Sequence, residues 1–95
     1  APNDIEWMRA SGNYVNLPMR GHDYPLRSTI AGIEGKLDPE RFIRVHRSYI
    51  VNLDQVGSIE PLDTGDARVH MKDGSNLPCS RTYRGSLRQR VGQDG

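Results

Sequence analysis

Short runs of hydrophobic and β-branched residues follow one another along the chain, separated by clusters of glycine, proline, asparagine and aspartate. Within several runs apolar and polar residues alternate with the period of a β-strand, and the clusters between them are typical of turns. The expected strands are residues 5–9, 14–17, 24–27, 42–45, 48–53, 56–62, 67–71 and 76–79. The pattern predicts a mostly antiparallel β chain, and short strands at this spacing suit a sandwich or a barrel-like packing.

Turn residues indicate how these strands connect. Gly-Asn at residues 12–13 predicts a turn between the first two strands, and residues 20–23 turn the chain into the third. Pro25 indicates an edge strand, because proline cannot donate a hydrogen bond to a neighbouring strand. Residues 63–66 and 73–74 are expected to join the last three strands into a β-meander.

Two segments have the spacing of helices instead. Ile30, Ile33 and Leu37 recur at i, i+3 and i+7, which places them on one helical face. Ser28 and Thr29 precede them and are suitable N-caps. We therefore expect a first short helix that ends at Leu37.

A second amphipathic helix is expected over residues 82–93, where hydrophobic residues recur at steps of four among arginines. Its hydrophobic residues are Tyr83, Leu87 and Val91. Ser80 and Thr82 are both candidate caps. The predicted fold class is therefore mainly β, with one or two short α-helices.

The composition fits one small folded domain. The chain has 95 residues, of which 35% are hydrophobic and 26% charged, so we expect a single domain over residues 1–95 with its function on the surface. No apolar run approaches the roughly 18 residues of a membrane span. The first four residues do not have the pattern of a signal sequence. We expect a cytoplasmic domain without membrane contact.

The formal net charge is only +1, but the charges are unevenly distributed. Residues 41–53 and 80–91 contain arginines and no acids, and 11 of the 13 cationic residues are arginine. The planar guanidinium group suits contacts with phosphate and with guanine edges. This favours a nucleic-acid partner, although arginines on a solvated surface would give the same composition.

No catalytic or metal-binding pattern is found in the sequence. Cys79 is the single cysteine, so it can form neither an internal disulfide nor a cysteine-based zinc site. It could pair with His46 or His70 as a nucleophile and base, but no orienting acid motif accompanies them. The three histidines lack the i, i+4 spacing of metal ligands. We expect no enzymatic activity, no metal and no cofactor.

One motif is specific enough to indicate a family. The heptad H-R-S-Y-I-V-N at residues 46–52 follows F-I-R at 42–44, and S-R-T-Y occurs at 80–83. This chain resembles, over nearly its whole length, the LytTR domain, the DNA-binding output module of LytR/AlgR-type bacterial response regulators. The resemblance implies an elongated fold of small antiparallel sheets, in which loops rather than a recognition helix enter the DNA grooves.

The resemblance also implies partners. Two copies are expected to bind two tandem half-sites of double-stranded DNA, so a homodimer on DNA is one possible arrangement. The sequence shows no receiver domain with its phosphorylatable aspartate, so we expect the signal to be sensed by a part outside this sequence or by another protein.

Arg47 lies at the break between two apolar strands, where its side chain points to solvent or to a phosphate. The resemblance places a DNA contact at this position, and we expect Arg47 to be a positioning or minor-groove residue. His46 lies beside it. A histidine flanked by strand residues commonly has a packing and hydrogen-bonding role, so both this role and a DNA contact stay open for His46.

Ser80 lies where a strand leads into a helix, and free amides at a helix N-terminus can bind a phosphate. The resemblance places base reading within the two positions after this serine, which are Arg81 and Thr82. Arg84 and Arg88 follow on the helix and are phosphate candidates.

The first hairpin turn corresponds to the second major-groove loop of the family. Ser11 and Asn13 are its candidate hydrogen-bonding residues, and Arg9 adds a candidate phosphate contact. Asn13 could instead serve only the turn, because asparagine tolerates a left-handed backbone.

These residues predict a sequence-specific DNA-binding domain of a bacterial transcriptional regulator. The alternative is a module of the same fold that binds a regulatory protein partner, as an anti-activator does, and does not itself bind DNA. A basic face favours the first function, whereas an exposed apolar patch would favour the second.

Overall fold

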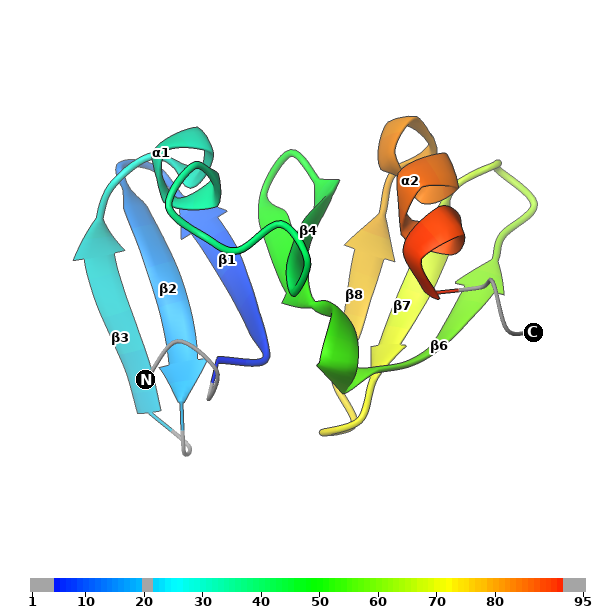
Figure 1. Cartoon of the computed structure of the whole chain (residues 1–95), viewed down its shortest axis with the longest axis horizontal. Helices are drawn as coiled ribbons and strands as arrows, with labels where there is room; N and C mark the ends of the chain where they lie inside the picture. Colours follow the sequence, from blue (N-terminus) through cyan, green and yellow to red (C-terminus); the bar gives the residue numbers. More distant parts are fainter. Residues whose placement is uncertain (1–4, 20–21, 92–95) are drawn as a thin grey trace.

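The computed structural model describes residues 5–19 and 22–91. It is elongated, with principal dimensions of 34 × 23 × 22 Å (Figure 1). Its elements in chain order are β1 (Trp7–Ser11), β2 (Tyr14–Met19), β3 (His22–Arg27), α1 (Ile30–Glu34), β4 (Phe42–His46), β5 (Tyr49–Asn52), the 3-10 turn η2 (Leu53–Gln55), β6 (Val56–Pro61), β7 (Ala67–Met71), β8 (Asn76–Cys79) and α2 (Arg81–Val91).

The strands form two antiparallel sheets. The first has the order β3-β2-β1-β5-β4, and the second is the meander β6-β7-β8. These are orders of open sheets, so the described strands do not close into a barrel. The predicted mainly β fold with two short helices is confirmed, as is the edge position of the strand that contains Pro25.

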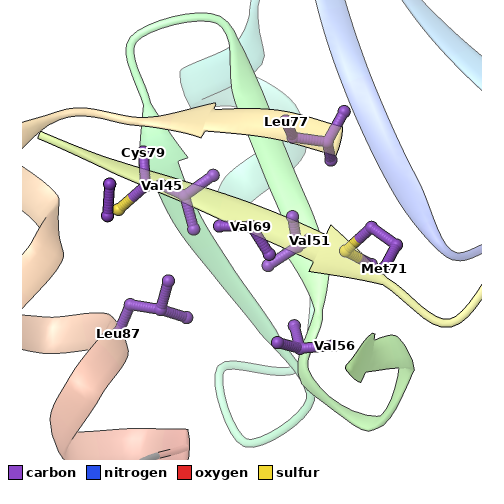
Figure 2. Close-up of a cluster of buried hydrophobic side chains, with 9 residues drawn as sticks. Val45, Val51, Val56, Val69, Met71, Leu77, Cys79 and Leu87 are labelled. Atoms are coloured by element: carbon purple, nitrogen blue, oxygen red, sulfur yellow. The ribbon is translucent and has the colours of Figure 1, made fainter. Parts of the chain in front are cut away.

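The hairpin of β4 and β5 lies in the middle of the molecule, with a hydrophobic core on each of its faces. Val51 belongs to the first core and its neighbour Ile50 to the second, because successive side chains of a strand point to opposite faces. The first core joins this hairpin to the second sheet and to α2, and Figure 2 shows Leu87 pointing into it. The second core joins the hairpin to β1, β2 and α1.

The first core consists of Val45, Val51, Val56, Ala67, Val69, Met71, Leu77, Cys79 and Leu87. The second consists of Ile5, Met8, Val15, Ile30, Ile33, Phe42 and Ile50. Helix α2 therefore depends on packing through one fully buried residue, Leu87, whereas the other face of the helix carries arginines.

The first helix is shorter than predicted. It begins after its N-cap Thr29, whose hydroxyl accepts a hydrogen bond from the Gly32 amide, but it ends at Glu34 rather than at Leu37. Gly32 and Gly35 weaken helix propagation, since each costs about 1 kcal/mol relative to alanine. Leu37 lies beyond the helix and is half-buried against the second core.

The second helix begins at Arg81, so Thr82 lies within its first turn, and of the two candidate caps it is Ser80 that precedes the helix. The Ser80 carbonyl precedes the helix and accepts hydrogen bonds from the amides of Tyr83 and Arg84. Of the turn predicted at residues 20–23, residues 20–21 lie outside the described residues, whereas His22 and Asp23 already belong to β3. The predicted helix end at 92–93 also lies outside the described residues. No helix among those described is long and apolar enough to cross a membrane.

Candidate nucleic-acid interface

Three connections lie along one long edge of the molecule, at the top of Figure 1. They are the β1–β2 turn (residues 12–13), the β4–β5 turn (residues 47–48) and the junction between β8 and α2 (residues 80–82). We call these three connections the turn edge. The structure thus brings together three segments, far apart in sequence, that contain five of the ten predicted site residues: Asn13, Arg47, Ser80, Arg81 and Thr82. The other five lie in the adjoining elements: Arg9 and Ser11 in β1, His46 in β4, and Arg84 and Arg88 in α2.

Two backbone hydrogen bonds join the three connections. The Ala10 amide at the end of β1 donates to the Ser48 carbonyl at 2.8 Å. The Ser80 amide donates to the Val45 carbonyl, also at 2.8 Å. The β4–β5 turn therefore lies between the other two connections, and the spacing along the edge is fixed by backbone contacts.

The β1–β2 turn presents short polar side chains. Ser11 and Asn13 are both exposed, and Gly12 between them has a φ of +61°, which permits the tight turn. The Asn13 carbonyl accepts a hydrogen bond from the Ser28 amide at 3.0 Å, which connects the turn to the start of α1. Arg9 is exposed in β1.

The β4–β5 turn separates the two residues predicted there. Arg47 is exposed, as expected from its position at the break between strands. His46 is half-buried: its Nδ1 atom accepts a hydrogen bond from the Ser48 amide at 3.1 Å, and its ring packs against Tyr49 at a centroid distance of 5.6 Å. This geometry gives His46 a packing and hydrogen-bonding role in the turn.

The junction between β8 and α2 differs from the expectation of free helix amides. The Arg81 amide donates to a carboxylate oxygen of Asp66 at 2.9 Å. An acid from the β6–β7 loop therefore occupies the position in which a phosphate would bind to that amide. The side chains of Arg81 and Thr82 are exposed beside it.

Ion pairing distinguishes two groups of arginines. Each of four arginines lies within 3.4–3.6 Å of a carboxylate: Arg41, Arg44, Arg68 and Arg90. Among the residues described, no salt bridge involves the predicted DNA contacts Arg9, Arg47, Arg81, Arg84 and Arg88. Ion pairs with described carboxylates therefore set these four arginines apart from the candidate residues.

The α2 arginines point in different directions. Arg90 donates to the Pro39 carbonyl at 2.6 Å and so belongs to the packing of the helix. Arg81, Arg84 and Arg88 are spaced at i, i+3 and i+7, which places them on another face of the helix. Arg88 is exposed and Arg84 is half-buried.

Sequence reasoning missed three residues that shape this edge. Arg44 donates two hydrogen bonds to the β4–β5 turn. Asp66 holds the start of α2, and Gly65 lies under the Arg81 side chain: a Cβ atom at Gly65 would be 3.1 Å from Arg81 Cδ. The sequence identified residues 63–66 only as a turn, because no local signal shows which distant group a turn residue contacts.

Cys79 is fully buried in the first core, and burial raises the pKa of its thiol above the ordinary value. A protonated buried thiol is a poor nucleophile and metal ligand. Within the described part of the chain, no group of three or more His, Cys, Asp and Glu residues could hold a metal ion. Cys79 therefore has a packing role.

The sequence is similar to a known family and to several of its members. Residues 1–92 match the family described as the LytTr DNA-binding domain. The chain is 38% identical over 86 residues to the sensory transduction protein LytT of Bacillus subtilis (strain 168), which covers 90% of this chain and 36% of that protein. It is 32% identical over 88 residues to the transcriptional regulatory protein YpdB of Escherichia coli (strain K12), which covers 92% and 36%.

The fold is also similar to a solved structure of a LytTr DNA-binding domain from Bacillus cereus. The TM-score is 0.85, the sequence identity is 23%, and the match covers 95% of this chain and 83% of that one. The resemblance read from the heptad at residues 46–52 is therefore confirmed by the family match, and the predicted fold by this structure. The chain spans 36% of the length of the two relatives named above.

Proposed function

The chain belongs to the LytTR family of DNA-binding domains, and we propose that it binds double-stranded DNA sequence-specifically as the output domain of a bacterial transcriptional regulator. Residues 1–95 form one such domain, which acts in the cytoplasm by binding alone, without catalysis, metal or cofactor. The observation that carries the proposal is the turn edge, where exposed arginines make no ion pair with any described residue.

The order of the three connections supports this mode of binding. Along one face of B-DNA, a minor groove lies between two successive major grooves. The β1–β2 turn and the β8–α2 junction flank the β4–β5 turn along the edge (Figure 1). Two outer connections can therefore enter successive major grooves, while the central turn meets the minor groove between them.

Each connection has a chemistry suited to its groove. At the junction, the Arg81 guanidinium and the Thr82 hydroxyl can bind base edges in a major groove. At the β1–β2 turn, Ser11 and Asn13 provide hydrogen-bonding groups for the other major groove. Arg47 suits a minor groove, whose negative potential attracts arginine.

The remaining predicted residues position the domain on the DNA. Arg9, Arg84 and Arg88 bind phosphates, which fixes the orientation of the protein without reading sequence. The Ser80 hydroxyl contributes a further phosphate contact. His46 supports the β4–β5 turn from its half-buried position.

The arrangement of partners follows from the same mode of binding. Two copies bind two tandem half-sites, as a homodimer on DNA. The greater length of the relatives, one of which is named a sensory transduction protein, supports a further, signal-sensing part beside such a domain. That part supplies the signal that changes DNA binding.

Selection from a random duplex pool tests the proposal, followed by titration of the selected duplex at increasing salt. Because several phosphates are neutralised, the logarithm of the binding constant should fall with the logarithm of salt by about 0.9 for each phosphate contact. A flat salt dependence, or a pool from which no duplex is selected, would instead favour a module that binds a protein partner.

A further inference from the structure

Arg44 is a largely buried arginine inside β4, with 19% of its side chain exposed. Its Nε atom donates to the His46 carbonyl at 3.2 Å, and its Nη2 atom donates to the Arg47 carbonyl at 2.7 Å. The pairing of β4 with β5 is irregular between Arg44 and His46. Carbonyls at such an irregularity need other partners, and the Arg44 guanidinium provides them.

The other side of the same guanidinium contacts both helices. Its Nη1 atom lies 3.5 Å from a carboxylate oxygen of Glu34 at the end of α1. Its central carbon lies 5.7 Å from the centre of the Tyr83 ring in α2, within the range of a cation–π contact. One rigid group thus connects the β4–β5 turn to α1 and to α2.

These contacts have a consequence for the turn edge. Each nitrogen of Arg44 has a protein partner, so the side chain is not directed toward an external phosphate. The Arg44 guanidinium binds the Arg47 carbonyl on one side. On its other side it contacts Tyr83, which lies two residues after Arg81 in α2. Arg44 therefore links the backbone of the proposed minor-groove residue to the helix that contains a proposed major-groove residue.

We propose that Arg44 is a positioning residue for DNA recognition: it fixes the β4–β5 turn against α2, so that Arg47 and Arg81 are held at the spacing of their two grooves. This inference rests on the proposed DNA-binding function. Lysine cannot replace the arginine, because its single ammonium group lacks the planar fork that spans two carbonyls and stacks on an aromatic ring.

The test compares Arg44→Lys with Arg41→Lys. The control removes a guanidinium at the other end of β4, where Arg41 is exposed and lies 3.6 Å from Asp54. Arg44→Lys should weaken binding to the selected duplex about tenfold, since it loses hydrogen bonds to a charged group. Binding to random duplex and the salt dependence should stay as in the wild type, and Arg41→Lys should leave all three unchanged.

A double-mutant cycle with Arg47→Ala separates positioning from general stability. Once the positioned side chain is gone, Arg44→Lys should add less than about a twofold further loss. Amide hydrogen exchange at Ser48 in the DNA-free protein should be faster in Arg44→Lys and unchanged in Arg41→Lys. If Arg44→Lys does not fold, Tyr83→Leu takes its place in the cycle, because it removes only the stacking contact.

Each alternative result has a definite meaning. If the wild type binds the selected duplex and Arg44→Lys binds it with the same affinity, the inference is overturned and the proposed function stands. A fall of about one in the salt slope would show that Arg44 contacts a phosphate directly. A full tenfold loss in the Arg47→Ala background would show that Arg44 does not act through Arg47. If the wild type binds no duplex, the proposed function fails and the inference fails with it.

Discussion

The carboxylate of Asp66 accepts a hydrogen bond from the Arg81 amide at 2.9 Å, so the β6–β7 loop holds the first residue of α2. A carboxylate at this position satisfies an otherwise free amide and interacts favourably with the positive end of the helix dipole. The same charge lies beside the proposed base-reading residues, where it would repel a DNA backbone. We therefore expect Asp66 to stabilise the helix and to oppose DNA binding.

Replacement of Asp66 separates these two effects. Asp66→Asn keeps an acceptor oxygen and removes the charge, so it should bind duplex DNA more tightly at low salt while the free energy of unfolding changes little. Asp66→Ala also removes the acceptor and should cost about 1 kcal/mol of stability. Urea unfolding and duplex titration measure the two quantities. Weaker DNA binding by the asparagine variant would contradict the repulsive role.

A pair of glycines tests whether the β6–β7 loop positions Arg81. Gly65 and Gly74 have φ values of +94° and +95°, but a Cβ atom at Gly65 would lie 3.1 Å from Arg81 Cδ, whereas one at Gly74 would meet open space. Alanine at either site should destabilise the fold by about 1 kcal/mol, because both backbones are left-handed. Only Gly65→Ala should also weaken binding to the selected duplex. Equal DNA binding by both folded variants would argue against a role of the β6–β7 loop in positioning Arg81.

The Arg81 side chain can be tested without disturbing the helix start, because its contact with Asp66 uses the backbone amide. Arg81→Ala, or Thr82→Ala beside it, should lower affinity for the selected duplex by roughly 1–3 kcal/mol and relax the preference at one base pair. Arg84→Ala and Arg88→Ala are the matched controls. They should weaken selected and random duplexes equally and reduce the salt slope by about one each.

If all four variants change the affinity for the selected and the random duplex alike, base recognition by Arg81 and Thr82 is not distinguished from phosphate binding by Arg84 and Arg88. Small and equal effects would mean that the DNA binds a different face of the molecule. Circular dichroism of each variant confirms that the helix is retained, which makes a loss of binding interpretable.

An acidic unfolding experiment addresses the outer face of the second sheet. The hydrogen bond between Glu60 and His70, 2.9 Å long, lowers the pKa of Glu60 below its ordinary value of 4.5, and Arg68 adds to this effect against the opposing desolvation. Because the pKa is lower in the folded state, the stabilisation is present above the unfolded pKa and is lost as the pH falls through the folded pKa.

Glu60→Gln should therefore reduce the loss of folding stability at low pH. Its urea midpoint should fall less steeply than that of the wild type between about pH 6 and about pH 3. Glu40→Gln is the control, since Glu40 pairs with Arg90 rather than with a histidine. Parallel curves for the wild type and Glu60→Gln would contradict the role of this contact.

Local patterns predicted the elements well. The alternation at residues 14–17 reflects the two-residue period of strands, which does not depend on distant partners. The break expected at residues 46–47 lies one residue later, at 47–48, because His46 still pairs with Tyr49. The end of α1 was misplaced because Leu37 continues the helical spacing although the backbone leaves the helix at Gly35. The Leu37 side chain stays half-buried beyond the last helical residue, so the spacing of hydrophobic residues alone does not mark the end of the helix.

The relations between distant segments were not predictable. The sequence placed Arg47 and Arg81 in exposed basic segments, which required only local reasoning. Their fixed spacing depends on contacts such as Ser80 with Val45 and Asp66 with Arg81, which join residues far apart in the chain. No period or motif specifies such pairs, so the supporting residues of the edge became visible only in the fold.

Arg47, as the proposed minor-groove residue, should respond to groove width rather than to a unique base code. Arg47→Ala should weaken binding most on duplexes whose spacer between the two major-groove contacts is A·T-rich, where the groove is narrow and its potential most negative. On G·C-rich spacers, the variant and the wild type should differ less. Parallel titrations of spacer-swapped duplexes with unchanged outer sequences measure the difference, and Arg68→Ala, on the second sheet, is a control that should show no spacer dependence. A loss for Arg47→Ala that is the same on every spacer would reassign Arg47 to a phosphate contact.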